Sequence, residues 1–213
     1  MRTFDWQAII FDFDGVVVES GKIKTQAFAE LYRPYGEEIV AAVVQFHNRN
    51  GGMSRYRKFH YFQQHFLAKP PLTAEEEKEL DRRFSELVVE AVIASDPVPG
   101  AMELIRQQAE KIPLFIASGT PEVELKAIVE RRGLTPYFTE VRGAPTLKQS
   151  LVAEILSAHQ LTPESVLMIG DALVDYESAH TNDVAFLGRV YPGDRNPFPA
   201  HVEIVPDLCG LVA

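Results

Sequence analysis

The sequence AIIFDFDGVVVES, residues 8–20, places two aspartates, Asp12 and Asp14, directly after four apolar residues. A short apolar run bounded by a glycine is typical of a buried strand. Side chains of a strand alternate between its faces, so these two carboxylates share a face where the strand ends. Two buried like charges repel, and Mg²⁺, which favours carboxylates together with phosphate oxygens, would relieve that repulsion. The stretch therefore predicts a metal-assisted anion site; the alternative is a surface turn, permitted by Gly15, with both aspartates solvated.

The composition bounds the class of protein. Of the 213 residues, 46% are hydrophobic and 24% are charged, which is enough for one packed domain with a smaller one inserted. A formal net charge of -9 argues against a nucleic-acid-binding protein, which needs a basic face. The single cysteine, Cys209, excludes a disulfide framework and a zinc cluster. Residues 1–5 do not open a signal peptide and no apolar run could span a membrane, so we expect a cytoplasmic protein with neither membrane nor nucleic-acid partners.

Short apolar runs alternate with helical patterns in the second half of the chain. A helix is expected over 122–132, with Pro121 at its first turn and Gly133 past its end, and another has apolar residues at every fourth position from Leu147. Strands that alternate with helices predict an α/β fold, a Rossmann-like parallel sheet with helices on both faces. Ligands of such folds bind at the carboxyl ends of the strands. The expected strands are 8–13, 114–117, 166–169 and 184–187, with weaker candidates at 137–141 and 202–205.

The segment between the first two strands has a different pattern. It shows no strand alternation, and the expected helices are 23–32, 37–46, 54–67 and 74–94. The helical segment ends at residues 96–100, which contain two prolines and a glycine. We therefore expect an α-helical cap domain, residues 17–96, inserted into a core domain that consists of residues 1–16 and 97–213.

A second polar site follows the strand that ends at Ala117. Ser118 and Gly119 come next, and a helix then begins. Backbone amides at a helix start bind anions well. The alternative is a helix cap, in which Ser118 or Thr120 accepts hydrogen bonds from the first-turn amides. Both can hold at once.

A third site follows the strand 166–169, where Asp171 ends the strand and Asp175 comes four residues later. One of the two could cap the following helix. Alternatively, Asp171 meets Asp12 and Asp14 around one metal ion. Lys148 begins another expected helix, where its charge is unfavourable against the helix dipole unless an anion lies nearby.

In chain order, these motifs resemble those of the haloacid dehalogenase superfamily of hydrolases. The helical insertion resembles that of its helical-cap subgroup, which includes phosphoglycolate phosphatases and β-phosphoglucomutase. Two positions depart from the pattern: Ala172 stands where many members carry Ser or Thr, and Gly119 stands where Asn is common in the subgroup. The motifs that carry the resemblance are Asp12-x-Asp14-Gly15, Ser118-Gly119, Lys148 and Gly170-Asp171-x-x-x-Asp175.

The resemblance implies a Mg²⁺-dependent phosphoric monoester hydrolase that works through an aspartyl-phosphate. Asp12 would be the nucleophile, and Asp14 would be the general acid and then the base. Mg²⁺ would be held by Asp12, the backbone carbonyl of Asp14 and Asp171, with Asp175 as a support of this shell or as a direct ligand. The residues expected to bind the phosphate are Gly15, Ser118, Gly119 and Lys148.

The cap would select the substrate. Arg55 lies at the loop end of an apolar stripe on the helix expected over 54–67. As a hypothesis, Arg55 binds a substrate carboxylate or a second phosphate; the alternative is a surface arginine with a buried stem. The stripe consists of Phe59, Phe62 and Phe66. Three neighbours are expected to be solvated: Arg57, Lys58 and His60.

The leading functional prediction is a phosphatase for a small phosphorylated metabolite, acting as a monomer or homodimer. A phosphomutase of the β-phosphoglucomutase type is the alternative. It uses the same nucleophile but excludes water while the intermediate exchanges partners. A catalytically silent binding protein on this fold is a third prediction, against which the presence of Asp12 argues.

Overall fold

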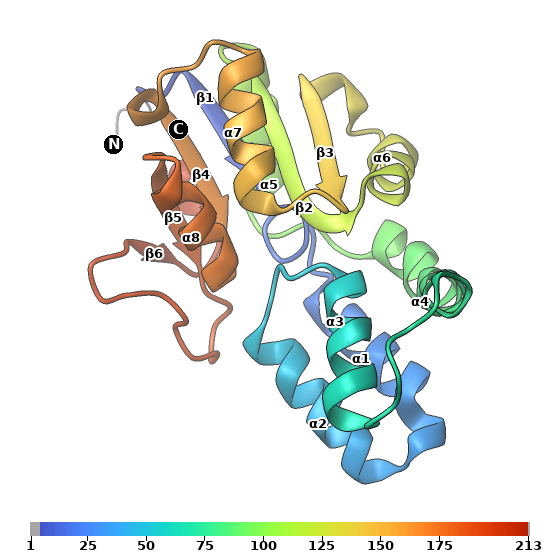
Figure 1. Ribbon diagram of the computed structural model, residues 1–213. Coiled ribbons are helices and arrows are strands. Elements are labelled where there is room, and N and C mark those ends of the chain that lie inside the picture. Colours follow the sequence, from blue (N-terminus) through green and yellow to red (C-terminus); the bar gives the residue numbers. More distant parts are fainter. Residues whose placement is uncertain (1–4, 213) are drawn as a thin grey trace.

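The computed structural model describes residues 5–212; the first four residues, on which part of the signal-peptide prediction rests, and residue 213 lie outside the described residues. Its centre is a six-stranded sheet in the order β3-β2-β1-β4-β5-β6, and every neighbouring pair is parallel (Figure 1). This confirms the predicted α/β fold. The strands are β1 (Ala8–Phe11), β2 (Leu114–Pro121), β3 (Glu140–Ala144), β4 (Val166–Gly170), β5 (Ala185–Arg189) and β6 (Ile204–Val205).

Alternate residues of the central strand β1 enter two separate apolar cores. Ile9 and Phe11 pack on the face that α5 (Ala101–Ala109) and α6 (Glu122–Arg131) cover. Ala8 and Ile10 pack on the opposite face, with α7 (Lys148–Ala158) and α8 (Leu173–Thr181). All four side chains are fully buried, as expected of a central parallel strand covered on both sides. Helix α5 has no counterpart among the helices expected from the sequence.

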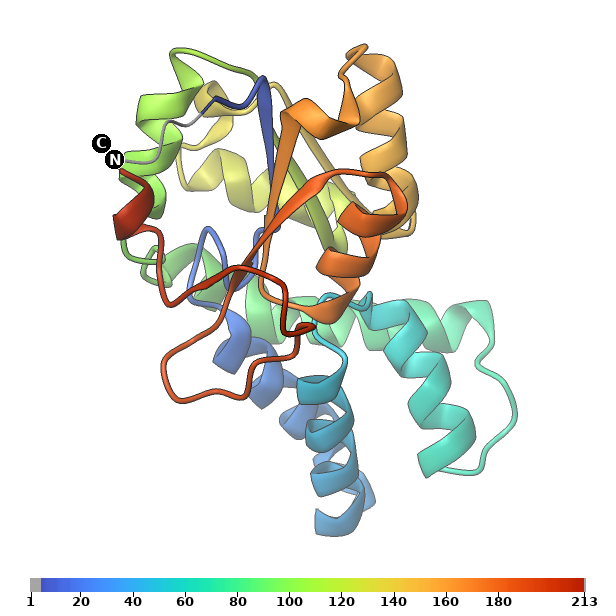
Figure 2. The same ribbon diagram turned by 90° about the vertical axis from the view of Figure 1, so that its left-hand side faces the viewer.

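Four helices between β1 and α5 form a second body, which we call the helical block (residues 21–94). It lies beyond the carboxyl ends of the strands in both views (Figures 1 and 2). Aromatic rings fill its centre: the ring of Phe28 lies 4.4 Å from that of Phe84 and 5.8 Å from that of Phe62, between centroids. The helices are α1 (Gly21–Tyr32), α2 (Glu37–Arg49), α3 (Arg55–Tyr61) and α4 (Ala74–Ala94).

One of the expected helices is interrupted. The helix predicted over 54–67 ends as α3 at Tyr61 and continues as a π-helical turn, Phe62–Phe66. The amide of Leu67 donates to the carbonyl of Phe62, five residues earlier, at 3.0 Å. The wider turn brings the rings of Phe62 and Phe66 into a stack with centroids 5.4 Å apart.

The chain enters and leaves the helical block at one place. The amide of Glu19 donates to the carbonyl of Asp96 at 3.0 Å, and the amide of Val98 donates to the carbonyl of Val17 at 3.1 Å. The two connecting segments therefore run side by side. The division into domains at residues 17 and 96 stays a prediction. Within residues 5–212, no helix has both the length and the apolar character needed to cross a membrane.

Candidate active site

The site begins where β1 ends. Asp12 is only 2% exposed, and its Oδ1 accepts a hydrogen bond from the amide of Phe13 at 2.8 Å. Gly15 turns the backbone with φ +78°, a conformation that favours glycine. A Cβ on Gly15 would lie 2.1 Å from Oδ2 of Asp171, so the turn after β1 presses against the end of β4. The alternative of a surface turn with both aspartates solvated is wrong for this stretch, because Asp12 is buried and the Asp14 side chain is 16% exposed.

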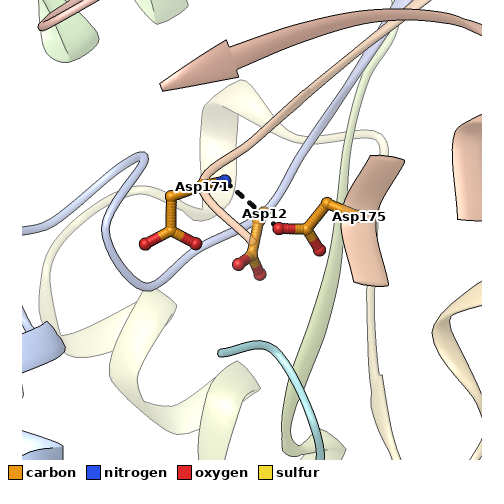
Figure 3. A group of neighbouring side chains, drawn as sticks. All are labelled: Asp12, Asp171 and Asp175. Carbon is orange, nitrogen blue, oxygen red and sulfur yellow. Dashed lines mark hydrogen bonds between the residues drawn. The ribbon is translucent and has the colours of Figure 1, made fainter. Parts of the chain in front are cut away.

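Three carboxylates gather at this point. Asp12, Asp171 and Asp175 each offer an oxygen, and these oxygens lie within 4.8 Å of one another (Figure 3). Oδ2 of Asp175 accepts hydrogen bonds from the amides of Asp171, at 3.2 Å, and Ala172, at 2.9 Å. Asp175 thus caps the start of α8 while Asp171 lies beside Asp12. The capping alternative is therefore confirmed for Asp175, and the meeting of Asp171, Asp12 and Asp14 around a metal ion stays a prediction.

Lys148, the first residue of α7, connects two of these carboxylates. Its buried Nζ lies 2.9 Å from Oδ1 of Asp12 and donates a hydrogen bond to Oδ1 of Asp175. Burial disfavours its charge, but the attraction of Asp12 and Asp175 outweighs burial and raises the pKa of Lys148. The anion that the sequence required near Lys148 is, in this structure, the carboxylate pair itself.

The charges in this cluster do not balance. Burial, and the nearby Asp175 and Asp14, raise the pKa of Asp12 to about 7 in spite of the attraction of Lys148. Burial and the negative charges of Asp12 and Asp175 raise the pKa of Asp171 well above its ordinary value. A divalent cation fits here, because the donors are all carboxylate oxygens and, among the ion pairs of residues 5–212, only Lys148 offsets their negative charge.

Asp14 has a separate set of partners, which the sequence analysis missed. Lys24 of α1 forms an ion pair with its Oδ2, the hydroxyl of Ser20 donates to Oδ1 at 2.6 Å, and the hydroxyl of Thr120 donates to Oδ2 at 2.9 Å. Burial opposes ionisation of Asp14, but Lys24 and these hydrogen bonds outweigh it and lower its pKa. The carboxylate of Asp14 is thus held by Lys24, Ser20 and Thr120, and Asp14 is not one of the three clustered carboxylates. The sequence signal for Lys24 was its position, one helical turn after Ser20.

Ser118 and Gly119 lie at the end of β2. The buried hydroxyl of Ser118 accepts a hydrogen bond from the amide of Thr120 at 3.1 Å. Pro121 is the residue that precedes α6, and no side chain caps that helix. The alternative in which Ser118 or Thr120 caps α6 is therefore wrong, because both hydroxyls are used within the site.

A loop of the helical block rests directly on the core. A Cβ on Gly119 would lie 2.4 Å from the carbonyl oxygen of Gly52, and one on Gly51 would lie 3.1 Å from Cβ of Ala172. The two departures from the family pattern, Gly119 and Ala172, are thus the two small residues on which this glycine loop sits. Beside the contact is a cavity of about 170 Å³, whose lining includes Gly52, Gly119 and Lys148.

Arg55 and Lys58 of α3 are both buried, and this differs from the sequence analysis. The guanidinium of Arg55 is bound by Glu124 of α6, by Asp81 at 3.2 Å and by Ser85 at 2.7 Å. The surface-arginine alternative is therefore wrong, and substrate contact by Arg55 stays a prediction. Lys58 was expected to be solvated but is 2% exposed, because residues three apart share a helix face and Lys58 lies three residues after the buried Arg55.

Comparison with known proteins agrees with the family resemblance of the sequence motifs. The family model described as "haloacid dehalogenase-like hydrolase" matches residues 6–182. A phosphoglycolate phosphatase of Synechococcus elongatus is 26% identical over 181 residues, which cover 81% of this chain and 78% of that protein.

Two solved structures share the fold. β-Phosphoglucomutase from Clostridium difficile has a TM-score of 0.79 at 17% identity, with 97% of this chain and 93% of that chain covered. A mutant of CbbY from Rhodobacter sphaeroides, in complex with xylulose-(1,5)bisphosphate, has a TM-score of 0.77 at 18% identity, with 97% and 96% covered.

Proposed function

The chain belongs to the haloacid dehalogenase-like hydrolases, and on that premise we propose that it is a Mg²⁺-dependent phosphatase of small phosphorylated metabolites, similar to phosphoglycolate phosphatases. The observation that carries the proposal is the buried Asp12, with Lys148 at 2.9 Å and the oxygens of Asp171 and Asp175 within 4.8 Å. A carboxylate held this way can attack phosphorus while its neighbours fix its orientation.

Asp12 is the proposed nucleophile. Lys148 contacts its Oδ1, and the amide of Phe13 donates to the same oxygen. These contacts orient the carboxylate and leave Oδ2 for attack on the phosphoryl group. The bond that forms is Asp12 O–P, and the bond that breaks is P–O to the leaving alcohol. Water then hydrolyses the aspartyl-phosphate and regenerates the carboxylate.

Asp14 is the proposed acid and base. It would protonate the leaving oxygen and afterwards take a proton from the attacking water, a contribution of about 10²–10⁴-fold. Its lowered pKa suits the base step. In the acid step the contact with Lys24 has to loosen, because a cation so close keeps the carboxyl ionised.

The residues proposed to hold Mg²⁺ are Asp12, Asp171 and the backbone carbonyl of Asp14, with Asp175 as a support or a further ligand. When bound, the ion supplies charge stabilisation for the phosphoryl oxygens and lets a carboxylate approach an anion. Phosphate oxygens are proposed to bind Ser118, Lys148 and the amides of Gly15 and Gly119. The helical block, as the proposed cap domain, closes over this site and excludes water.

The test is phosphate release from a panel of phosphorylated sugars, sugar acids, 2-phosphoglycolate and nucleotides, with Mg²⁺ and with a chelator. Metal-dependent release that Asp12→Asn abolishes, and that the exposed control Asp194→Asn retains, supports the phosphatase. A requirement for a bisphosphate activator would instead indicate a phosphomutase. If wild type and Asp12→Asn release phosphate equally, Asp12 is not the nucleophile.

A further inference from the structure

Lys58 differs from the other buried cations of the described chain. Arg55 is paired with Glu124, Lys148 with Asp12 and Asp175, and Arg189 with Glu19. Lys58 is as buried as these, yet within residues 5–212 no carboxylate forms an ion pair with it. Protonation of a buried amine without a counter-charge is costly, and burial accordingly lowers the pKa of Lys58 to about 7, so an anion beside it would favour the charged form.

The contacts of Lys58 do not neutralise it. Its Nζ lies 2.9 Å from Nδ1 of His47, and it stands 5.5 Å from the centre of the Phe28 ring. Burial, then Lys58 and Lys24, lower the pKa of His47 to about 2. His47 is therefore neutral and can accept a hydrogen bond from Lys58 at Nδ1. This contact orients the ammonium group but brings no negative charge to it.

The position of Lys58 connects it with the proposed catalytic groups. Helix α3 begins directly after the loop that rests on Gly119 and Ala172. Burial, followed by the positive charge of Lys24, lowers the pKa of Lys58 to about 7, while Asp14 and Asp171 act in the opposite direction. The groups whose charges reach Lys58 thus belong to the site, and Asp14 is the one proposed to serve the leaving oxygen.

We propose that Lys58 binds an anionic group on the alcohol part of the substrate, a carboxylate or a second phosphate. The inference rests on the proposed phosphatase function and names its substrate class: phosphomonoesters that carry a further negative charge. An anion beside Lys58 supplies the missing counter-charge and gives a buried, charge-assisted hydrogen bond. His47 is a positioning residue that holds the ammonium group. Arg55, which the sequence analysis named as a candidate for this contact, is already bound by carboxylates of this chain.

The experiment compares matched substrates in the presence of Mg²⁺. 2-Phosphoglycolate is paired with ethyl phosphate, and 1,3-propanediol bisphosphate with propyl phosphate, so that each pair differs in the second anionic group. Wild type is expected to prefer one anionic member at least tenfold in kcat/KM. Lys58→Met is expected to lower kcat/KM for that member by tenfold or more and to change the uncharged member less than threefold. Lys78→Met, an exposed lysine of the same helical block, is the control and keeps the wild-type preference.

The substrate pair whose preference is lost in Lys58→Met identifies the anion that Lys58 binds: a carboxylate for the 2-phosphoglycolate pair and a phosphate for the bisphosphate pair. A wild type without preference in either pair overturns the inference and needs no variant. So does a preference that Lys58→Met leaves intact; if that variant does not fold, Lys58→Gln takes its place. Hydrolysis of ethyl phosphate and p-nitrophenyl phosphate that depends on Asp12 reports the phosphatase separately. The substrate inference can therefore fail while the proposed function stands.

Discussion

Arg55 and Glu124 form a two-bond ion pair that joins the helical block to the core: both terminal nitrogens of the guanidinium contact the carboxylate, one of them at 2.9 Å. Arg55 belongs to α3 and Glu124 to α6, so the pair spans the same boundary as the glycine loop. Ser85 of α4 also donates a hydrogen bond to Glu124 at 2.5 Å. The guanidinium lies over the ring of Phe84, 4.6 Å from its centre.

Glu124→Gln tests this pair. The variant leaves the buried charge of Arg55 with only Asp81 as a carboxylate partner, and removal of one member of a buried pair typically costs about 3 kcal/mol. We expect a loss of roughly that size in the free energy of unfolding, measured by urea denaturation. Glu130→Gln, an exposed glutamate on the same helix, should unfold like the wild type. Equal stability of both variants would show that the pair adds nothing to folding.

Gly119→Ala tests the contact of the glycine loop with the core. The added methyl group would lie 2.4 Å from the backbone carbonyl of Gly52, which has to move. Because the loop precedes α3 and borders the site, we expect kcat/KM to fall roughly tenfold or more, with a small change in Tm. Gly21→Ala is the matched control, since nothing lies within 4 Å of its added Cβ. Wild-type kinetics in Gly119→Ala would contradict a functional role for this contact.

Asp171→Asn tests whether Asp171 carries unfavourable negative charge in the metal-free protein and whether it binds Mg²⁺. The raised pKa of Asp171 means that its ionised form destabilises the metal-free fold. In a chelator at pH 7.5 we therefore expect Asp171→Asn to be more stable than wild type, measured by urea denaturation. Mg²⁺ should raise the Tm of wild type and have little effect on that of the variant. A variant less stable than wild type in the chelator would count against the charge imbalance described for this cluster.

His47 predicts a pH dependence of folding. Its folded pKa is about 2, below the ordinary 6.5, so the unfolded chain binds a proton first as the pH falls. The penalty is absent above pH 6.5 and grows below it by about 1.4 kcal/mol per pH unit. Between pH 6.5 and 5, wild type should therefore lose about 2 kcal/mol more than His47→Gln, measured by urea denaturation. The groups acting on His47 are Lys58, Lys24 and Asp14. His65→Gln, at an exposed histidine, should follow the wild-type profile; a parallel profile for His47→Gln would refute the prediction.

The sheet and the acidic cluster were predictable because the information is local. Asp12 and Asp171 each end an apolar run, and the parallel topology brings such ends together whatever the rest of the chain does. The helix 54–67 was harder to predict, since nothing in its spacing announces the π-helical turn at Phe62. The partners of the charged side chains on α3 were not predictable from the sequence. Arg55 and Lys58 are both basic residues on one helix, and only the tertiary arrangement gives Glu124 to the first and, among residues 5–212, no carboxylate ion pair to the second.

The paired strands of backbone at residues 17–19 and 96–98 have an evolutionary consequence. The two segments that connect the helical block to the core are hydrogen-bonded to each other. The chain between them can therefore be lengthened, shortened or exchanged without a change in the order of the strands in the sheet. If the helical block selects the substrate, as proposed, its sequence can change during evolution while the residues at the strand ends stay the same. A helical segment from another protein can be exchanged between the same two positions, residues 17–19 and 96–98.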